Sequence, residues 1–499
     1  MIFMLFSSMI FIWVFFALVI VVNFAFNLMP FTLESSRIRA KNIFLLIASL
    51  FFYAWGGIYY LLIMVSSILI NFAGGYVIKL GVRSKTGKRI ALIVIVTLNI
   101  AILFFFKYFN MFIAIIESVM QSGQSAGAVL NTMLSMQGTG ELGLAKVVLP
   151  IGISFFTFQS MSYVIDVYTD KADLQENIVD FALYVSLFPQ LIAGPIVKYS
   201  DVALQLRDRR ESLDMFIYGQ KRFCYGLAKK VMLSNTFAKI ADDIWALDTE
   251  TLGAPVAWLG ILAYTLQIYY DFSGYSDMAI GLGRMLGFDF KENFNYPYTS
   301  LSVQEFWQRW HISLSTWFKE YIYIPLGGNR KGKFRTYVNV FVVFAVTGIW
   351  HGANFTFIAW GLFYAVLQII ERLFLGKLLK KNPLKAINWI YTMLAVMIGW
   401  VYFRSDTIFE ANEFVIQMFS FKQGEQSILT HLSMNALIMF ALGILLCGFV
   451  QRPLQKYYDK VRYTLPVLIA DYSLQMVLFV WTILQLIGST YNPFIYFQF

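Results

Sequence analysis

Apolar runs suitable for crossing a bilayer, several of them short or broken by Gly and Pro, follow one another along almost the whole chain of 499 residues. They lie near residues 9–29, 42–56, 58–79, 90–109, 147–167, 179–197, 254–285, 336–350, 353–371, 387–403, 432–450 and 472–488. Hydrophobic residues make up 59% of the sequence and charged residues 14%, which is more apolar surface than a soluble fold can bury. The pattern predicts an all-α polytopic membrane protein with roughly 11–12 transmembrane helices.

The charged loops predict how these helices cross the membrane. Loops 31–41, 81–89 and 329–335 are basic and are expected inside, whereas loop 404–431 is net acidic and is expected outside. This alternation places both termini outside, and the first span lacks the basic start of a cleavable signal. The net charge of +10 is explained by the same loops, and no motif indicates nucleic acid as a partner.

The middle of the chain departs from regular crossing. Segment 179–197 would begin and end on one face and contains two prolines, so we expect it to be re-entrant. Residues 213–240 are basic and predict an amphipathic helix on the cytoplasmic surface. We expect one membrane domain over residues 1–471, with its core at 180–404, followed by a last span and tail at 472–499.

Two of the three histidines, His311 and His351, lie in the most apolar half of the chain. A titratable side chain at bilayer depth is costly and is usually functional. Histidine is also the side chain best suited to move a proton near neutral pH. Both histidines are therefore candidate catalytic residues.

The surroundings of His311 have helical spacing. Segment 303–321 carries an aromatic stripe at three- and four-residue steps, and on such a helix Trp307, His311 and Ser315 share a face. Arg309 can reach water or a phosphate. The alternative is an interfacial helix in which the histidine has a structural partner only.

His351 is flanked by Gly348 and Gly352, which let backbone or ligand approach closely. The alternative is a structural histidine, for which Asn354 or Thr347 could be the hydrogen-bond partner.

Asp271 and Asp277 lie within an apolar stretch, where carboxylates must be paired, solvated or protonated. They could line a polar funnel. We favour a structural role, in which hydroxyls and Arg284 bind them. No metal site is expected, because the histidines lack metal-ligand spacing and Cys224 and Cys447 form no zinc or disulfide pattern.

The sequence contains four distinctive motifs: Pro-Gln-Leu-Ile-Ala-Gly-Pro at 189–195, Asp-Phe-Ser-Gly-Tyr-Ser-Asp at 271–277, Phe-Trp-Gln-Arg-Trp-His-Ile-Ser-Leu-Ser at 306–315 and Trp-His-Gly-Ala at 350–353. Together they resemble the membrane-bound O-acyltransferase (MBOAT) superfamily, and within it the alginate O-acetyltransferase and peptidoglycan O-acetyltransferase branch. The resemblance covers nearly the whole chain. It implies a fold with re-entrant segments and a central funnel or tunnel.

The resemblance also implies roles for these residues. His351 would be the catalytic histidine in the funnel, and His311 would be the second essential one, which stabilises the oxyanion or holds the donor. We expect the funnel or donor site to include further residues: Trp307, Arg309, Ser315, Trp350, Asn354, Asp271 and Asp277. The basic residues Arg330, Lys331 and Lys333 could also hold donor phosphates or an acidic carrier protein, although the same charges satisfy the positive-inside rule.

The implied donor is acetyl-CoA or an acyl carrier protein thioester, with no tightly bound cofactor. The implied setting is the bacterial inner membrane and its lipid. An external SGNH-type transferase would pass the acyl group to a polysaccharide.

The C-terminal tail resembles a motif of the same branch, with sequence Phe-Ile-Tyr-Phe-Gln-Phe at 494–499. In the related teichoic-acid system a similar motif lies on a separate single-span protein, and its tyrosine is an acyl relay candidate. Tyr496 holds that position here. The alternative is an aromatic anchor at the membrane interface.

Three other functions are also compatible with the sequence. A proton-coupled transporter or flippase could use the same buried Asp and His residues, although we find no paired broken helices in related halves. A D-alanyl, lipid or protein acyltransferase would use the same superfamily site. A non-catalytic scaffold for polymer synthesis would need neither histidine.

Overall fold

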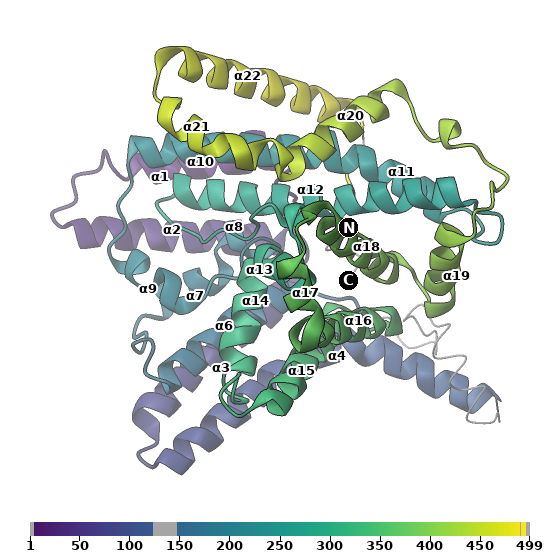
Figure 1. Ribbon diagram of the computed structural model, residues 1–499. Helices are drawn as coiled ribbons and strands as arrows, with labels where there is room; N and C mark the ends of the chain where they lie inside the picture. Colours follow the sequence, from purple (N-terminus) through teal and green to yellow (C-terminus); the bar gives the residue numbers. More distant parts are fainter. Residues whose placement is uncertain (1–3, 123–146, 490, 496–499) are drawn as a thin grey trace.

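The computed structural model describes residues 4–122, 147–489 and 491–495, and every regular element in these ranges is helical (Figure 1). The expected all-α fold is therefore confirmed. Tyr496 and residues 123–146 lie outside the described residues. Segment 110–146 is nearly uncharged and is expected to form an external loop, but its described part, 110–122, continues α4 as helix.

The helices follow one another in this order. The first third contains η1 (Phe11–Phe16), α1 (Ala17–Ala25), α2 (Glu34–Ala54), α3 (Ile58–Tyr76), η2 (Val77–Gly81) and α4 (Lys85–Ser122). The middle contains α6 (Ile153–Tyr168), α7 (Ile178–Ser186), α8 (Phe188–Leu191), α9 (Tyr199–Arg207), α10 (Leu213–Ala228), η3 (Lys229–Ser234), α11 (Asn235–Trp245), α12 (Ala254–Met285), η4 (Pro297–Thr299), α13 (Val303–Arg309), α14 (Ile312–Phe318) and η5 (Lys319–Tyr323). The last third contains α15 (Lys333–His351), α16 (Phe355–Ile370), η6 (Glu371–Leu375), α17 (Gly376–Lys381), α18 (Lys385–Arg404), α19 (Ile408–Phe419), η7 (Ile428–Thr430), α20 (Met434–Ile444), η8 (Leu445–Phe449), α21 (Gln451–Val461) and α22 (Leu465–Gly488).

Five described helices are long and apolar enough to cross a membrane, and a bent pair adds a sixth if it is one span. The five are Ile58–Gly81, Lys85–Ile113, Phe355–Lys381, Lys385–Arg404 and Leu465–Gly488, and the pair is Met434–Phe449 with Gln451–Val461, bent by 70°. This is fewer than the roughly 11–12 expected from apolar runs of spanning length. The difference arises because several apolar runs form shorter helices or carry polar residues that are buried inside the protein.

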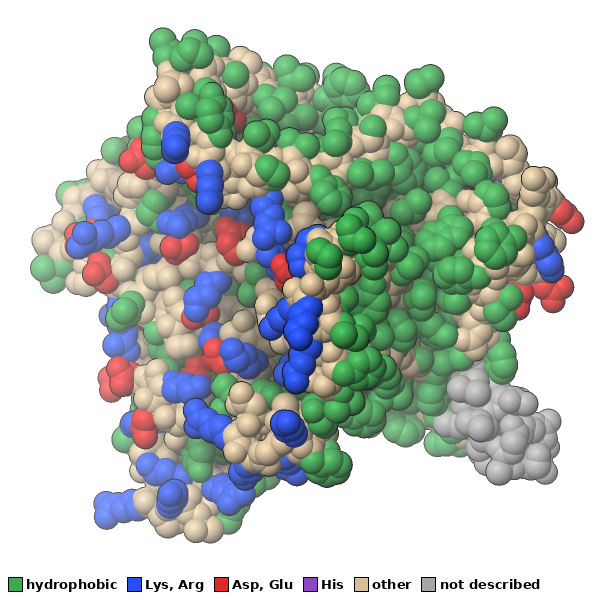
Figure 2. Space-filling view, viewed as in Figure 1, with side chains coloured by type: hydrophobic (Ala, Val, Ile, Leu, Met, Phe, Trp, Pro, Cys, Tyr) green, Lys and Arg blue, Asp and Glu red, His purple; other side chains and the backbone are tan. Residues whose placement is uncertain are grey.

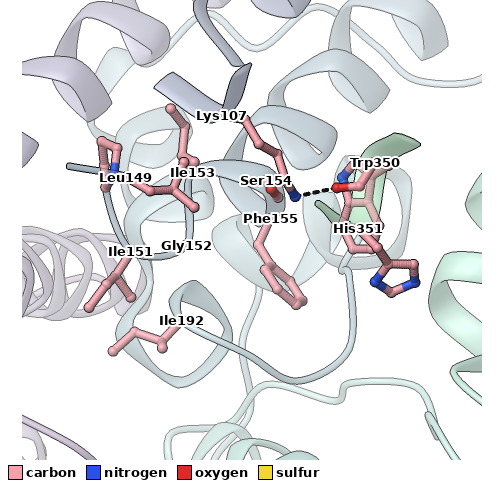
Figure 3. A pocket seen from close by; sticks show the side chains of 11 residues that line it. Lys107, Leu149, Ile151, Gly152, Ile153, Ser154, Phe155, Ile192, Trp350 and His351 are labelled. Carbon is pink, nitrogen blue, oxygen red and sulfur yellow. Dashed lines mark hydrogen bonds between the residues drawn. The ribbon is translucent and has the colours of Figure 1, made fainter. Parts of the chain in front are cut away.

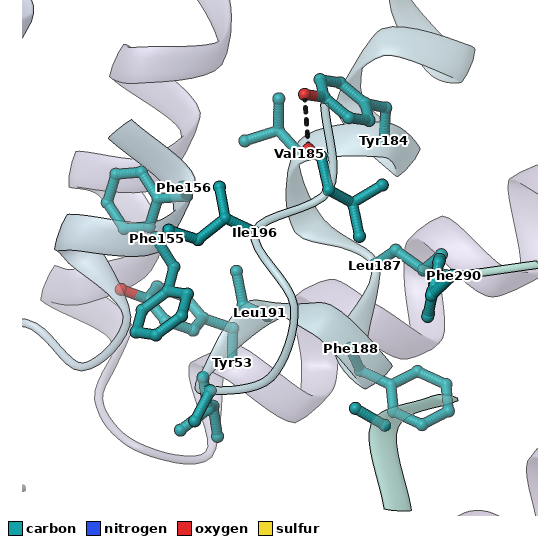
Figure 4. Packing of buried hydrophobic residues seen from close by; sticks show 14 of the residues in the cluster. Tyr53, Phe155, Phe156, Tyr184, Val185, Leu187, Phe188, Leu191, Ile196 and Phe290 are labelled. Atoms are coloured by element: carbon teal, nitrogen blue, oxygen red, sulfur yellow. Dashed lines mark hydrogen bonds between the residues drawn. The ribbon is translucent and has the colours of Figure 1, made fainter. Parts of the chain in front are cut away.

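The expected re-entrant segment is indeed broken. Two short helices, α7 and α8, replace a continuous span, and Leu187 between them has a ψ of 113° that ends the first helix. Almost every side chain from 180 to 197 is buried, so protein rather than lipid surrounds the broken backbone. Residues of α6, α7 and α8 form part of a large aromatic and aliphatic core (Figure 4).

The expected surface helix at 213–240 is wrong, because α10, η3 and α11 form one continuous helical run packed along α12. Glycines bring the two helices together. A Cβ atom at Gly219 would lie 2.5 Å from the carbonyl oxygen of Gly281, and one at Gly226 would lie 2.6 Å from that of Gly274. Small residues at such interfaces let the backbones of membrane helices approach closely. Basic composition alone therefore misassigned a buried helix.

The charged side chains are distributed unevenly over the surface. Figure 2 shows that Lys and Arg gather on the left of the viewed face, where Figure 1 places α9, whereas the right part is largely apolar. This agrees with the positive-inside pattern along the sequence.

The two ends of the described chain lie side by side, and the last described residues do not remain on the surface (Figure 1). Asn492 Nδ2 donates to Ser7 Oγ at 2.9 Å. Beyond it the chain turns into the protein, so that Phe494 and Ile495 are only 3% and 2% exposed. An interfacial anchor does not describe residues 491–495.

Candidate active site

His311 interrupts the helix that we expect over 303–321. Its φ of 44° and ψ of 56° are left-handed, so α13 ends at Arg309 and α14 begins at Ile312. This conformation costs a non-glycine residue about 1–2 kcal/mol. Such strain persists only where the surroundings enforce it, and it is concentrated at functional sites.

Asn293 supplies much of that enforcement. Its backbone oxygen accepts from Ile312 N at 2.9 Å, and its side-chain Oδ1 accepts from Ser313 N at 3.2 Å and from Ser313 Oγ at 2.8 Å. His311 Nδ1 lies 3.1 Å from the same Oδ1. The segment around Asn293 therefore holds both sides of the break.

These contacts determine the tautomer of His311. The amide of Asn293 is oriented by two backbone groups, because Oδ1 faces the Ser313 N–H and Nδ2 faces the Gly194 carbonyl at 3.3 Å. Since Oδ1 can only accept, Nδ1 of His311 must carry the proton. Nε2 then presents a lone pair, and within the described structure this buried atom has no hydrogen-bond partner. In this tautomer a neutral His311 therefore presents a hydrogen-bond acceptor at Nε2.

Asn293 also joins three of the four sequence motifs. Its Nδ2 contacts Gly194 of the 189–195 motif and Ser276 Oγ of the 271–277 motif, the latter at 3.1 Å. Its Oδ1 contacts the 306–315 motif through His311 and Ser313. The motifs lie far apart in sequence, and one buried amide brings them together.

His351 is the last residue of α15 and is buried in an aromatic cluster. Its ring contacts Trp350, Trp360 and Phe403, with centroid separations of 4.8, 4.9 and 5.1 Å. Gly348 permits this placement, because a Cβ there would lie 2.5 Å from the Phe357 carbonyl oxygen of α16. The expected close approach of backbone at Gly348 is therefore confirmed.

The structural alternative for His351 required a hydrogen-bond partner. Asn354 instead caps α16 by accepting from Thr356 N at 3.1 Å, and its Nδ2 donates to the Asp406 carbonyl at 2.6 Å. Thr347 Oγ1 donates to the Val343 carbonyl. Among the residues the structure describes, none forms a hydrogen bond with the imidazole of His351, which leaves it available to a substrate.

A cavity of about 80 Å³ adjoins His351 and Trp350. The opposite wall comes from α4, from the segment that leads into α6 and from the first turn of α6, and it includes Lys107 and Ser154 (Figure 3). The Lys107 ammonium donates to the carbonyl of Trp350, and the neighbouring Tyr108 hydroxyl donates to the carbonyl of Ile349. These groups satisfy free carbonyls at the C-terminus of α15, where a cation is also favoured by the helix dipole.

The other residues expected near His311 have mainly structural partners. Trp307 packs against Trp360 and thereby links the His311 segment to the ring that contacts His351. Ser315 Oγ donates to the Trp307 carbonyl at 3.1 Å. The Arg309 guanidinium is bound to Glu305 at 2.8 Å, so it does not face the histidines as a free donor-binding group.

Asp271 and Asp277 are paired, but not with Arg284, which binds Asp289 instead. Asp277 binds Arg222 and Lys229 at 2.7 and 2.6 Å, so its charge is compensated within the helix pair.

Asp271 binds Lys230 at 2.6 Å and accepts from the backbone N–H of Ile495 at 2.8 Å. The next residue of the same motif, Phe272, contacts His311 with a centroid separation of 4.6 Å. The tail therefore reaches the interior near His311, and its described part ends at the residue before Tyr496.

Sequence reasoning missed Asn293 and Lys107. Asn293 stands in no motif and could be found only from its contacts. Lys107 carried a usable signal, because it is a lysine within an apolar run at the end of an expected span, and a cation there requires a partner.

The fold and site define an integral membrane protein with two buried histidines, one of which lines a cavity. The model of the membrane-bound O-acyltransferase family matches residues 104–409, and the chain belongs to this family. It is 42% identical over 480 residues to a probable alginate O-acetylase of Pseudomonas putida, which covers 92% of this chain and 95% of that protein.

Two further relatives have other acceptors in their names. A peptidoglycan O-acetyltransferase of Helicobacter pylori is 35% identical over 413 residues, covering 74% of this chain and 73% of that protein. A teichoic acid D-alanyltransferase of Bacillus subtilis is 27% identical over 261 residues, covering 50% of this chain and 65% of that protein. The chain is therefore a membrane O-acyltransferase.

Proposed function

We propose that this protein moves an acetyl group from a cytoplasmic thioester donor across the inner membrane for O-acetylation of an external polysaccharide. The observation that carries the proposal is the buried imidazole of His351, which lines a cavity and has no hydrogen-bond partner among the described residues. The names of the alginate and peptidoglycan relatives support acetyl as the group and a cell-envelope polymer as its destination.

His351 acts as the general base in this scheme. It removes the proton of the attacking hydroxyl as the oxygen bonds to the thioester carbonyl carbon, and it delivers that proton to the sulfur as the C–S bond breaks. The products are an oxygen ester and a free thiol. General acid–base catalysis of this kind contributes roughly 10²–10⁴ in rate.

His311 holds the donor rather than the oxyanion. The pantetheine arm of either acetyl-CoA or an acyl carrier protein has amide N–H groups, and the unpaired Nε2 lone pair of His311 can accept from one of them. Both donors share this arm, so the site fits either one.

Tyr496 is the proposed first acceptor. A thiol of pKa ~8.5 and a phenol of pKa ~10 are comparable leaving groups, so transfer from a thioester to a tyrosine is close to thermoneutral. The tyrosyl ester keeps enough reactivity to acylate a serine of an SGNH-type partner outside the membrane. That partner then acylates the polysaccharide.

The direction of transfer is supported by the position of the cavity. Its wall includes residues 149–155, which follow the segment expected outside, and the end of α15, which begins at a basic loop expected inside. The cavity therefore serves the acceptor side in this proposal, and the donor approaches from the side of His311.

The test is replacement of His351 by Ala, with His431→Ala as the matched control. His431 lies in the exposed segment between α19 and α20, where its Nε2 is 2.9 Å from Gln426 Oε1. We expect the His351 variant to be inserted and folded but to lose acetylation of the polymer, and the His431 variant to retain it. Normal acetylation by the His351 variant would overturn the proposal.

A further inference from the structure

The described C-terminal tail is bound along one helical run. Tyr491 donates to Asp242 of α11 at 2.6 Å, and Asn492 Oδ1 accepts from Asn235 at 3.2 Å. The Pro493 carbonyl then accepts from Lys230 of η3. From position 242 to position 230 the helix axis advances by about 18 Å. Successive tail residues therefore contact groups that lie progressively further along this run, and the tail passes into the protein interior.

The innermost contacts involve a buried ion pair. Lys230 and Asp271 have side chains that are 1% and 2% exposed and lie 2.6 Å apart. Lys230 donates to the carbonyl of Pro493, and Asp271 Oδ2 accepts from the N–H of Ile495 at 2.8 Å. The pair thus binds two main-chain groups of the tail that are two residues apart.

The ion pair needs the tail for its own hydrogen bonds. Ile495 N is the partner recorded for Asp271 Oδ2, while Oδ1 faces Lys230 and, at 3.4 Å, Ser234. Removing the tail would leave Oδ2 without that donor and Lys230 without one of its acceptors. Buried charged groups with unfilled hydrogen bonds are costly, so the pair favours the docked tail.

We infer that Lys230 and Asp271 form a latch that holds the C-terminal tail in the membrane core and positions it for acyl transfer. The latch recognises peptide backbone, while the Phe494 ring packs on Tyr275 with a centroid separation of 4.7 Å. The docking itself follows from these contacts alone. Its role in transfer rests on the proposed function, in which the residue after Ile495 is the first acceptor.

Two variants of the full-length protein test the latch from opposite sides. Lys230→Met with Asp271→Leu replaces the pair by apolar groups, a change that is often neutral for folding. Ile495→Pro removes the N–H that Asp271 accepts and leaves every core helix unchanged. The matched controls are Ile495→Val, which keeps that N–H, and Lys198→Met with Glu320→Leu, which removes another ion pair, 2.9 Å apart, away from the tail.

Docking is measured by cross-linking cysteines placed at Ser7 and Asn492, whose side chains are in hydrogen-bond contact. We expect both latch variants to cross-link at least tenfold more slowly than the controls, and to lose acyl transfer by a similar factor. Formation of the cross-link in a latch variant should then restore part of the transfer, which a merely structural role of the pair would not produce.

The outcomes separate the latch from the proposed function. Unchanged cross-linking in both latch variants would overturn the latch. Slower cross-linking with normal transfer would confirm docking and overturn the positioning role. Loss of transfer in His351→Ala is independent of cross-linking, so its failure would count against the proposed function and not against the docked tail.

Discussion

Replacement of Asn293 by Leu removes the amide that orients His311 and leaves a side chain of similar volume. The side chain of Asn293 forms five hydrogen bonds, two from Nδ2 and three to Oδ1. At about 0.6 kcal/mol for each hydrogen bond inside a membrane protein, their loss lowers the free energy of unfolding by about 3 kcal/mol. The protein should still fold, at a reduced melting temperature.

The functional effect of Asn293→Leu follows from the tautomer. Without Oδ1 as an acceptor, the tautomer of His311 with the proton on Nδ1 is no longer favoured. Nε2 then carries the proton in part of the molecules and cannot accept a hydrogen bond there. An amide N–H of the bound thioester that loses Nε2 of His311 as its acceptor costs about 1–3 kcal/mol. The value of kcat/KM for the thioester should therefore fall by roughly 10- to 100-fold. We expect Asn293→Asp, which keeps the acceptor oxygens, to lose less.

The assay combines steady-state transfer with ¹⁵N spectra of histidine-labelled protein. The chain has 3 histidines, so each ring gives a separable pair of nitrogen signals, and His311→Gln identifies its own pair by loss. We expect the Nδ1–H form of His311 in the native protein and a mixture in Asn293→Leu. A native Nε2–H form, or a Leu variant within threefold of native kcat/KM, would refute the reasoning.

Other changes test the remaining parts of the site. Lys107→Met should lower transfer about tenfold, because a charged hydrogen bond to the end of α15 is worth about 1.5 kcal/mol, whereas Lys107→Arg should keep most activity in the same assay. Gly361→Val should lower the melting temperature, since its Cβ would lie 2.5 Å from the Phe344 carbonyl and overpacking costs about 1–3 kcal/mol; an unchanged melting curve would contradict this packing. Tyr496→Phe keeps the aromatic ring but removes the acceptor oxygen, so polymer acetylation should stop; continued acetylation would exclude the relay.

Hydrophobicity predicted the class of fold, and five or six of the described helices also have the length and composition of a membrane span. The runs at 58–79, 387–403 and 472–488 correspond to long apolar helices in the structure. The run at 254–285 forms α12, whose carboxylates are compensated by α10 and η3 rather than exposed to water. The hydropathy of a sequence segment cannot distinguish a helix that faces lipid from one enclosed by protein, because apolar side chains are removed from water in both cases.

Local periodicity failed at His311 for a different reason. The aromatic residues at 306–321 have helical spacing, and α13 and α14 are indeed helical on either side of the break. The left-handed turn at His311 is imposed by Asn293, which is 18 positions away in sequence. Helical spacing describes contacts within a segment, whereas this break depends on a tertiary contact. The residue that violated the local pattern is one of the two expected site residues, consistent with strain being concentrated at functional sites.

The two histidines need not share one task, because different structural features hold them. α15 begins next to the basic loop 329–335 and reaches His351 after 19 residues, an axial length of about 28 Å. That length is close to the roughly 30 Å of the hydrocarbon core, so His351 lies far from the face on which α15 begins. His311 is tied instead to Asn293, which directly follows Glu292, a partner of Arg222 in the charged region at the end of α12. The two positions are nevertheless joined by aromatic contacts, because Trp307 lies four residues before His311 and packs on Trp360, whose ring contacts His351.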